Sequence, residues 1–193
     1  MGKAAKDWPQ LNFIIYHSAY RFAAGGKVED AWAQFEQTGR IEWVTDLAEI
    51  PAKHGVKNIY ADLGQIFAQS TVADPRVCAA MMGQLVKGLG ADHVVWGSDT
   101  IWTGSPQWQI EALRRLEIPE AMQKKYGLTP LGAAEGPVKT AILGQNNARL
   151  YKYTPEWRVA LATDRIAAMK KEYEEAGPAR SNLRYGYVIP SRG

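Results

Sequence analysis

Three short apolar runs stand out in the first half of the chain and predict buried strands. They span residues 11–19, 57–64 and 93–96, and each contains consecutive aliphatic and aromatic residues. Such runs are typical of parallel strands that are covered on both faces. Between them, residues 41–53 and 75–89 carry apolar positions at helical spacing. The alternation of strands and helices predicts an α/β fold built on a parallel sheet.

An ionisable residue follows each predicted strand at the same end: His17, Asp62 and Asp99. Parallel α/β folds place their chemistry at the carboxyl ends of the strands. We therefore expect these three side chains to face one common site. Each has a plainer alternative: Asp99 as a helix cap, Asp62 as a turn residue, and His17 bonded to a backbone carbonyl.

The second half of the chain predicts short helices followed by an extension. Residues 30–37 and 107–116 have helical spacing, and residues 161–176 form a charged amphipathic segment that ends at a Gly-Pro pair. The composition changes near residue 154. We expect a compact unit over residues 1–153 and a helical extension with a tail over residues 154–193.

The composition excludes several classes of protein. Of the 193 residues, 46% are hydrophobic and 22% charged, which is enough apolar material for a core. The net charge of +3 comes without a basic block, so we expect no nucleic-acid partner. A single cysteine, Cys78, excludes an internal disulfide framework. No apolar run suits a membrane span or a secretion signal, and we expect a cytoplasmic protein.

Four segments, taken in order, resemble a known family. They read Phe-Ile-Ile-Tyr-His at 13–17, Tyr-Ala-Asp at 60–62, Val-Trp-Gly-Ser-Asp at 95–99, and Ile-Leu-Gly-Gln-Asn-Asn-Ala-Arg-Leu-Tyr at 142–151. Their order and spacing resemble the carboxyl-terminal part of the amidohydrolase superfamily, in its amidohydrolase-2 branch. That branch contains metal-dependent hydrolases similar to aminocarboxymuconate-semialdehyde decarboxylase. The resemblance covers residues 11–153.

The resemblance implies a partial (β/α)8 TIM-type barrel comprising about strands six to eight. It also implies a divalent metal, usually Zn²⁺ with Mn²⁺ as the alternative, at the carboxyl end of the strands. Asp99 matches the position of the metal ligand on the last strand, and His17 that of a histidine that orients or activates water or substrate. Both would be catalytic residues. Asp62 would end strand seven, where its role stays open.

The chain departs from this family in one large respect. It has no His-x-His, and its other histidines, His54 and His93, are predicted at the wrong ends of their elements. A complete barrel takes about 250 residues, and a catalytic zinc needs more protein ligands than Asp99 alone. We therefore expect an incomplete and inactive piece that pairs with a missing amino-terminal half. Two unpaired sheet edges would also favour self-association.

Three functions are compatible with this reading. The first is hydrolysis of an amide, ester or lactone by metal-activated water. The second is non-oxidative decarboxylation of an aromatic or enoic acid, with Arg21 or Lys27 neutralising the substrate carboxylate. The third is a non-catalytic fragment that serves as an interaction module. For a small-molecule substrate we expect Tyr20, Arg21 and Trp102 to line the pocket, whereas packing is the better interpretation of Trp108.

Overall fold

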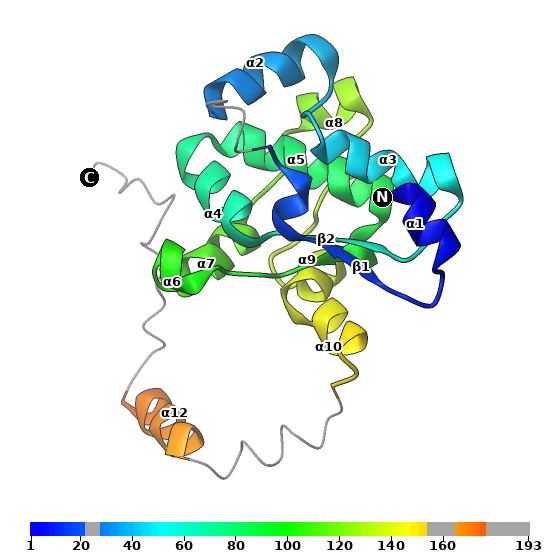
Figure 1. Ribbon diagram of the computed structural model, residues 1–193. Coiled ribbons are helices and arrows are strands. Elements are labelled where there is room, and N and C mark those ends of the chain that lie inside the picture. The colour runs from blue at the N-terminus through cyan, green and yellow to red at the C-terminus, as the bar shows by residue number, and fades with distance from the viewer. Residues whose placement is uncertain (22–27, 154–164, 177–193) are drawn as a thin grey trace, which may run out of the picture.

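The computed structural model describes residues 1–21, 28–153 and 165–176, and a small parallel sheet lies at its centre (Figure 1). The strands are β1 (Phe13–Ile15), β2 (Ile59–Asp62) and β3 (Val94–Val95), in the spatial order β1-β2-β3. Both pairings are parallel. The predicted α/β class is therefore confirmed. The described strands do not close into a barrel.

The first two strands are shorter than the sequence predicts. The first predicted strand, 11–19, stops at Ile15 because a 3₁₀ turn follows over Tyr16–Ala19. Within that turn the backbone enters the left-handed region, with φ between 51° and 59° at three consecutive residues, His17 to Ala19. The second predicted strand, 57–64, ends at Asp62 because a helix begins at Gly64.

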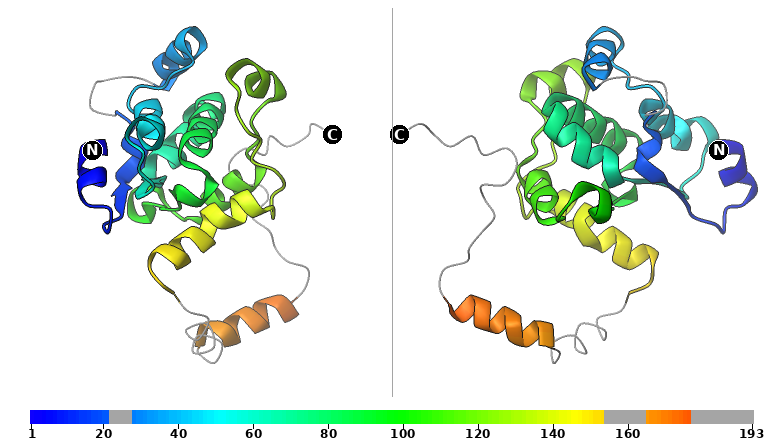
Figure 2. Two further views of the ribbon diagram at one scale, coloured as in Figure 1. Left: turned by 90° about the vertical axis from the view of Figure 1, so that its right-hand side faces the viewer. Right: turned by 60° about the vertical axis from the view of Figure 1, so that its left-hand side comes forward.

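Two long helices cover one face of the sheet. They are α3 (Val44–His54) and α5 (Pro75–Leu89), which pack against each other and against β2 (Figures 1 and 2). Consecutive strand order with both crossover helices on one face is the winding that barrels use, whereas doubly wound sheets carry helices on both faces. The core between these layers is apolar and includes Leu47, Ile59, Phe67, Cys78, Met82, Leu85 and Val94.

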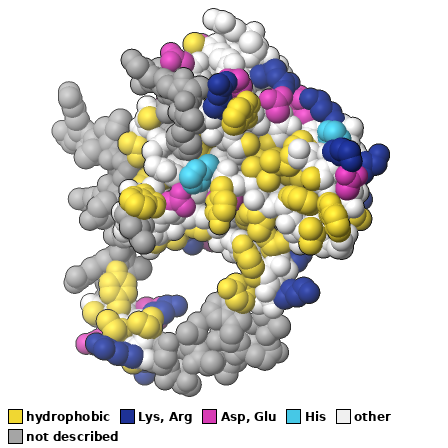
Figure 3. All heavy atoms as spheres, in the orientation of Figure 1, with side chains coloured by type: hydrophobic (Ala, Val, Ile, Leu, Met, Phe, Trp, Pro, Cys, Tyr) yellow, Lys and Arg dark blue, Asp and Glu magenta, His cyan; other side chains and the backbone are white. Residues whose placement is uncertain are grey.

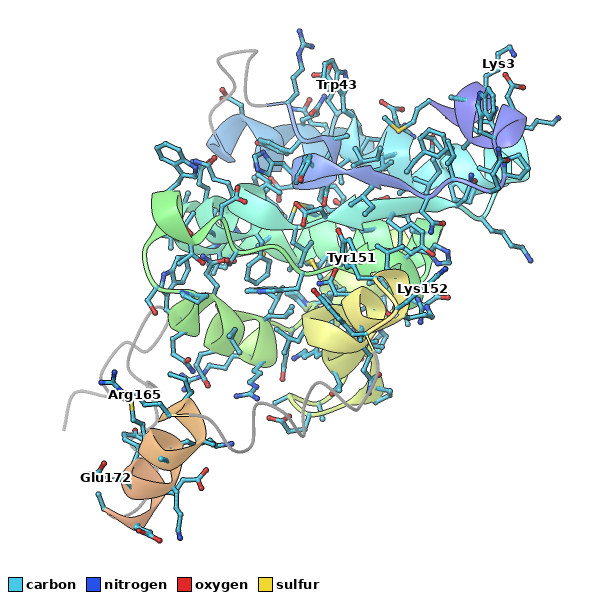
Figure 4. The ribbon with its side chains drawn as sticks, turned by 60° about the horizontal axis from the view of Figure 1, so that its bottom comes forward. Lys3, Trp43, Tyr151, Lys152, Arg165 and Glu172 are labelled. Carbon is cyan, nitrogen blue, oxygen red and sulfur yellow. The ribbon has the colours of Figure 1, made fainter. Side chains whose placement is uncertain are left out.

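The structure describes further helices. They are α1 (Gly2–Asp7), α2 (Val28–Thr38), α4 (Gly64–Ala73), α6 (Thr100–Thr103), α7 (Gln107–Arg115), α8 (Glu120–Tyr126), α9 (Pro137–Thr140), α10 (Asn146–Leu150) and α12 (Arg165–Glu175). A 3₁₀ turn precedes β3, and a π-helical turn joins α9 to α10. Trp43, before α3, and Tyr151, after α10, lie on opposite sides of the sheet (Figure 4).

Side-chain amides block the outer edge of β3. The Val95 carbonyl accepts the Leu63 N–H from the β2 side, so the carbonyls of Val94 and Trp96 face outward. Asn146 Nδ2 donates to the Val94 oxygen at 2.7 Å, and Asn147 Nδ2 donates to the Trp96 oxygen at 2.9 Å. Within the described residues, β1 and β3 each pair with a strand on one side only, that of β2, and on β3 the two asparagines bind the outward carbonyls.

The predicted extension is described only in part. Helix α12 lies within it, and its apolar side chains Ile166, Met169 and Tyr173 are all more than half exposed. Residues 154–164 and 177–193 of the predicted extension fall outside the described part of the chain. Within the described ranges, no helix combines the length and the apolar character that crossing a membrane requires.

Candidate functional site

The carboxyl end of the sheet brings the predicted residues together. His17 Nε2 lies 2.7 Å from Asp99 Oδ2, although 82 positions separate the two residues along the chain. The two groups follow β1 and β3 and meet across the end of β2, where Asp62 lies. Both side chains are partly exposed, so the pair can reach solvent or a ligand. The three side chains predicted to share one end of the sheet therefore lie together there.

The backbone is strained at both members of this pair. His17 has φ 51° and ψ 30°, and Asp99 has φ 48°. Non-glycine residues seldom adopt this left-handed region, and such conformations cluster at functional sites. The buried Ser18 helps to hold the first turn, because its hydroxyl donates to the Asp62 carbonyl oxygen at 2.9 Å. His17 and Asp99 are thus among the six described non-glycine residues with positive φ, which also include Ser18, Ala19, Trp43 and Lys152.

The Asp99 carboxylate does not cap its own helix. Asp99 occupies the N-cap position of α6, yet its side chain makes no capping hydrogen bond there. Instead Oδ2 accepts the Gln65 backbone N–H at 2.9 Å, in the first turn of α4, in addition to its bond with His17. The Asp99 carboxylate therefore caps the first turn of α4 rather than that of α6. The plainer alternative, a cap on its own helix, does not describe this residue.

Asp62 is the buried member of the site, with only 7% of its surface exposed. Burial raises the pKa of its carboxyl group to about 6, the His17 backbone N–H lowers it, and the charge of Asp99 raises it again. Two glycines leave room for this side chain. A Cβ on Gly97 would lie 2.3 Å from Asp62 Oδ1, and one on Gly64 would lie 2.6 Å from the His17 ring. Sequence spacing placed Asp62 at the strand end but could not predict this burial.

A polar network behind Asp99 fixes its loop, and sequence reasoning missed it. Thr103 Oγ1 lies 2.7 and 2.9 Å from the carbonyl oxygens of Ser98 and Asp99. Gln109, which is fully buried, donates from Nε2 to the Ser98 oxygen and to Thr103 Oγ1. The signal available in the sequence was a glutamine at a core position of the helix 107–116, since buried polar side chains are usually hydrogen-bonded.

The residues predicted to bind substrate lie in different surroundings. Tyr20 is half-buried and packs against the core. Arg21 pairs with Glu42 at 2.9 Å, and its guanidinium lies over the Trp43 ring. Trp102, on α6, is 82% exposed beside the Asp99 loop. Lys27 lies outside the described residues.

The side chains gathered at this site do not form a metal centre by themselves. No group of three or more His, Cys, Asp or Glu side chains within residues 1–21, 28–153 and 165–176 is placed to hold a metal ion. Oδ2 of Asp99, the ligand implied by the resemblance, already has two hydrogen-bond partners, His17 Nε2 and the Gln65 N–H. These residues therefore do not fit a complete zinc site.

Comparison with known proteins adds no further constraint on this site. No family model, curated protein or solved structure matches the chain.

Proposed function

We propose that the chain forms the carboxyl-terminal part of an amidohydrolase-like partial barrel and contributes an acid–base pair that hydrolyses an amide, ester or lactone. The observation that carries this proposal is the 2.7 Å contact between His17 and Asp99 at the carboxyl end of a singly wound parallel sheet. The left-handed backbone at both residues supports it. The amidohydrolase resemblance of the sequence favours the same chemistry.

In this proposal, each member of the pair moves a proton. Asp99 accepts the proton of the attacking water, whose oxygen adds to the substrate carbonyl carbon. The His17 imidazole shares the resulting charge and returns a proton to the leaving amine or alkoxide oxygen as the carbonyl re-forms. The products are a carboxylic acid and an amine or alcohol, so the reaction needs water as its only co-substrate.

A divalent ion of the amidohydrolase kind, Zn²⁺ or Mn²⁺, would supply a Lewis acid when bound. Since the described residues do not complete such a site, the remaining ligands would come from another polypeptide segment. The open edge of β1 supports pairing with such a segment. Hydrophobic side chains also gather on the face of the molecule that carries β1 (Figure 3), and exposed examples near that strand are Trp8, Leu11 and Tyr16.

Two other functions are weaker on specific grounds. Decarboxylation needs a cation for the substrate carboxylate; of the two candidates, Arg21 is paired with Glu42 and Lys27 lies outside the described residues. A non-catalytic interaction module is favoured by the exposed apolar side chains of α12, namely Ile166, Met169 and Tyr173. That alternative offers no explanation for the strained backbone at His17 and Asp99.

The experiment that tests the proposal measures zinc content and hydrolysis together. The chain is purified alone and with an added segment that carries a His-x-His, and both samples are assayed on ester, amide and lactone substrates. We expect zinc and turnover only in the second sample, and a loss of turnover of about 10²-fold or more in Asp99→Asn and His17→Gln. Stoichiometric zinc in the chain alone would contradict the composite site. Turnover that survives both substitutions would refute the assignment.

A further inference from the structure

A groove opens beside Asp99, between α4 and the segment that carries α6 and α7. Its volume is about 420 Å³. One wall is a single face of α4, because its residues recur three and four positions apart, and the other wall is formed by α6 and the start of α7. The lining residues are Gln65, Ala68, Gln69, Val72, Ala73, Trp102, Thr103 and Trp108.

Both walls of the groove begin at residues that touch Asp99. The Gln65 backbone N–H donates to Asp99 Oδ2 at 2.9 Å, and Thr103 Oγ1 lies 2.9 Å from the Asp99 carbonyl oxygen. The groove therefore adjoins the Asp99 loop, although neither His17 nor Asp99 lines it. A molecule whose reacting carbonyl lies at the pair can extend past this loop toward the groove.

The lining selects for a flat and uncharged group. Trp102 is 82% exposed and Val72 69% exposed, so both present large apolar surfaces. Trp108 is held in place, because its Nε1 donates to the Thr103 carbonyl oxygen at 3.3 Å. None of the described lining residues is charged. The side-chain amides of Gln65 and Gln69 make no hydrogen bond within the described part of the chain, so they can bind a polar substituent.

We propose that this groove binds the aromatic arm of a neutral amide, ester or lactone substrate, stacked on Trp102. That the ligand carries an amide, ester or lactone rests on the proposed hydrolytic function. That an aromatic ring binds in the groove does not depend on it. Aromatic rings stack on exposed indoles in offset or edge-to-face arrangements, and the groove volume falls within the range of small-molecule sites.

Phenylacetamide is a suitable probe, and its binding to the full chain can be followed by calorimetry. We expect Trp102→Ala to raise its dissociation constant about tenfold, as the loss of one aromatic contact predicts. Trp8→Ala is the matched control, since Trp8 is also exposed, at 55%, but does not line the groove. Acetamide, which lacks the ring, should bind at least about tenfold more weakly than phenylacetamide.

His17→Gln separates this inference from the proposed function. Assayed with the added His-x-His segment, the variant should lose hydrolysis; assayed alone, it should keep the preference for phenylacetamide over acetamide, because His17 does not line the groove. Equal binding of phenylacetamide and acetamide would overturn the inference, as would an equal effect of Trp8→Ala and Trp102→Ala. Either of those results would leave the hydrolytic assignment of His17 and Asp99 intact. Tenfold selectivity for phenylacetamide that depends on Trp102 would support the inference even without turnover.

Discussion

Two histidines at opposite ends of the same small sheet have contrasting environments. At the carboxyl end, His17 has a left-handed backbone and hydrogen bonds an aspartate side chain, Asp99. At the amino end, His93 bonds the Lys57 carbonyl oxygen at 2.8 Å through Nε2, and its ring stacks on Tyr60 with centroids 4.6 Å apart. The first arrangement joins two ionisable groups under strain. The second ties a ring to a backbone carbonyl, an aromatic neighbour and its sequence neighbour Asp92, whose Oδ1 lies 3.0 Å from Nδ1, with no positive φ at His93.

The surroundings of the two histidines extend this contrast. Along the outer edge of β3, the amides of Asn146 and Asn147 bind the backbone carbonyls of Val94 and Trp96. At the carboxyl end, Asp62 is buried and its pKa is raised. Barrel-type folds separate stability and chemistry between the two ends of the strands in the same way. We infer that substitutions at the β3 edge mainly affect stability, whereas substitutions at the carboxyl end also change the site.

Gly97→Ala should produce the largest effect. The new Cβ would lie 2.3 Å from Asp62 Oδ1, and Asp62 is too buried to move aside freely. We expect a loss of about 3 kcal/mol in the free energy of unfolding, measured by urea denaturation. Gly144→Ala is the control, because a Cβ there meets nothing within 4 Å. Equal losses in both variants would contradict the crowding at the carboxyl end.

Asp62→Asn should stabilise the protein at neutral pH. Burial raises the folded-state pKa of Asp62 to about 6 from the ordinary 3.8. As the pH rises from about 4 to 6, the unfolded chain loses this proton first, so the free energy of unfolding of the parent falls. Asparagine has no such proton to lose, so the free energy of unfolding of the variant does not fall in this way. Above pH 6 it should exceed that of the parent by up to about 3 kcal/mol. Urea denaturation at a series of pH values measures the difference.

Asp74→Asn provides a control of opposite sign. Arg76 lowers the pKa of Asp74, so the ionised carboxylate stabilises the fold above the unfolded pKa and loses that effect as the pH falls. Asp74→Asn should therefore lower the free energy of unfolding at neutral pH and have a smaller effect on it at acidic pH. If Asp62→Asn behaves like Asp74→Asn, then Asp62 is not the strained buried carboxyl group described here.

The sequence predicted the site better than it predicted the elements around it. The parallel-strand rule alone brought His17 and Asp99 to one end of the sheet, because it depends only on strand order and polarity. Helix α4 was not predicted: residue 64 was assigned to the strand 57–64, and no helix was predicted before residue 75. This segment contains Gly64, Thr71 and Val72, which are weak helix formers, and burial around most of its circumference erases an amphipathic pattern.

The burial of Asp62 and the blocked edge of β3 could not be predicted from local patterns. Each depends on residues far apart in the chain: Gly97 beside Asp62, and Asn146 beside Val94. The Gly-Gln-Asn-Asn-Ala-Arg run at 144–149 contributed to the family resemblance. In the structure its two asparagines hold the outer edge of β3.

Asn146→Ala tests the stabilising role of that edge. Its Nδ2 donates to the carbonyl oxygens of Ala91 and Val94, and the residue is 1% exposed. Leaving buried carbonyls without partners should lower the free energy of unfolding by about 2 kcal/mol. Asn147→Ala, which loses one bond to Trp96, should lower it by about 1 kcal/mol. An unchanged imidazole signal of His17 in nuclear magnetic resonance would confirm that the effect stays at this edge.

Thr103→Val should have the smallest effect on stability and a clear effect on the site. The substitution removes a hydroxyl that bonds the carbonyls of Ser98 and Asp99 and accepts from Gln109, so we expect a loss of about 1 kcal/mol. Because this network supports the strained Asp99 backbone, the hydrogen-bonded proton signal between His17 and Asp99 should broaden or shift in the nuclear magnetic resonance spectrum. Thr38→Val is the matched control, since its hydroxyl bonds the Gln34 carbonyl on exposed α2. A shift of the His17 signal of the same size in both variants would show that Thr103 does not position Asp99.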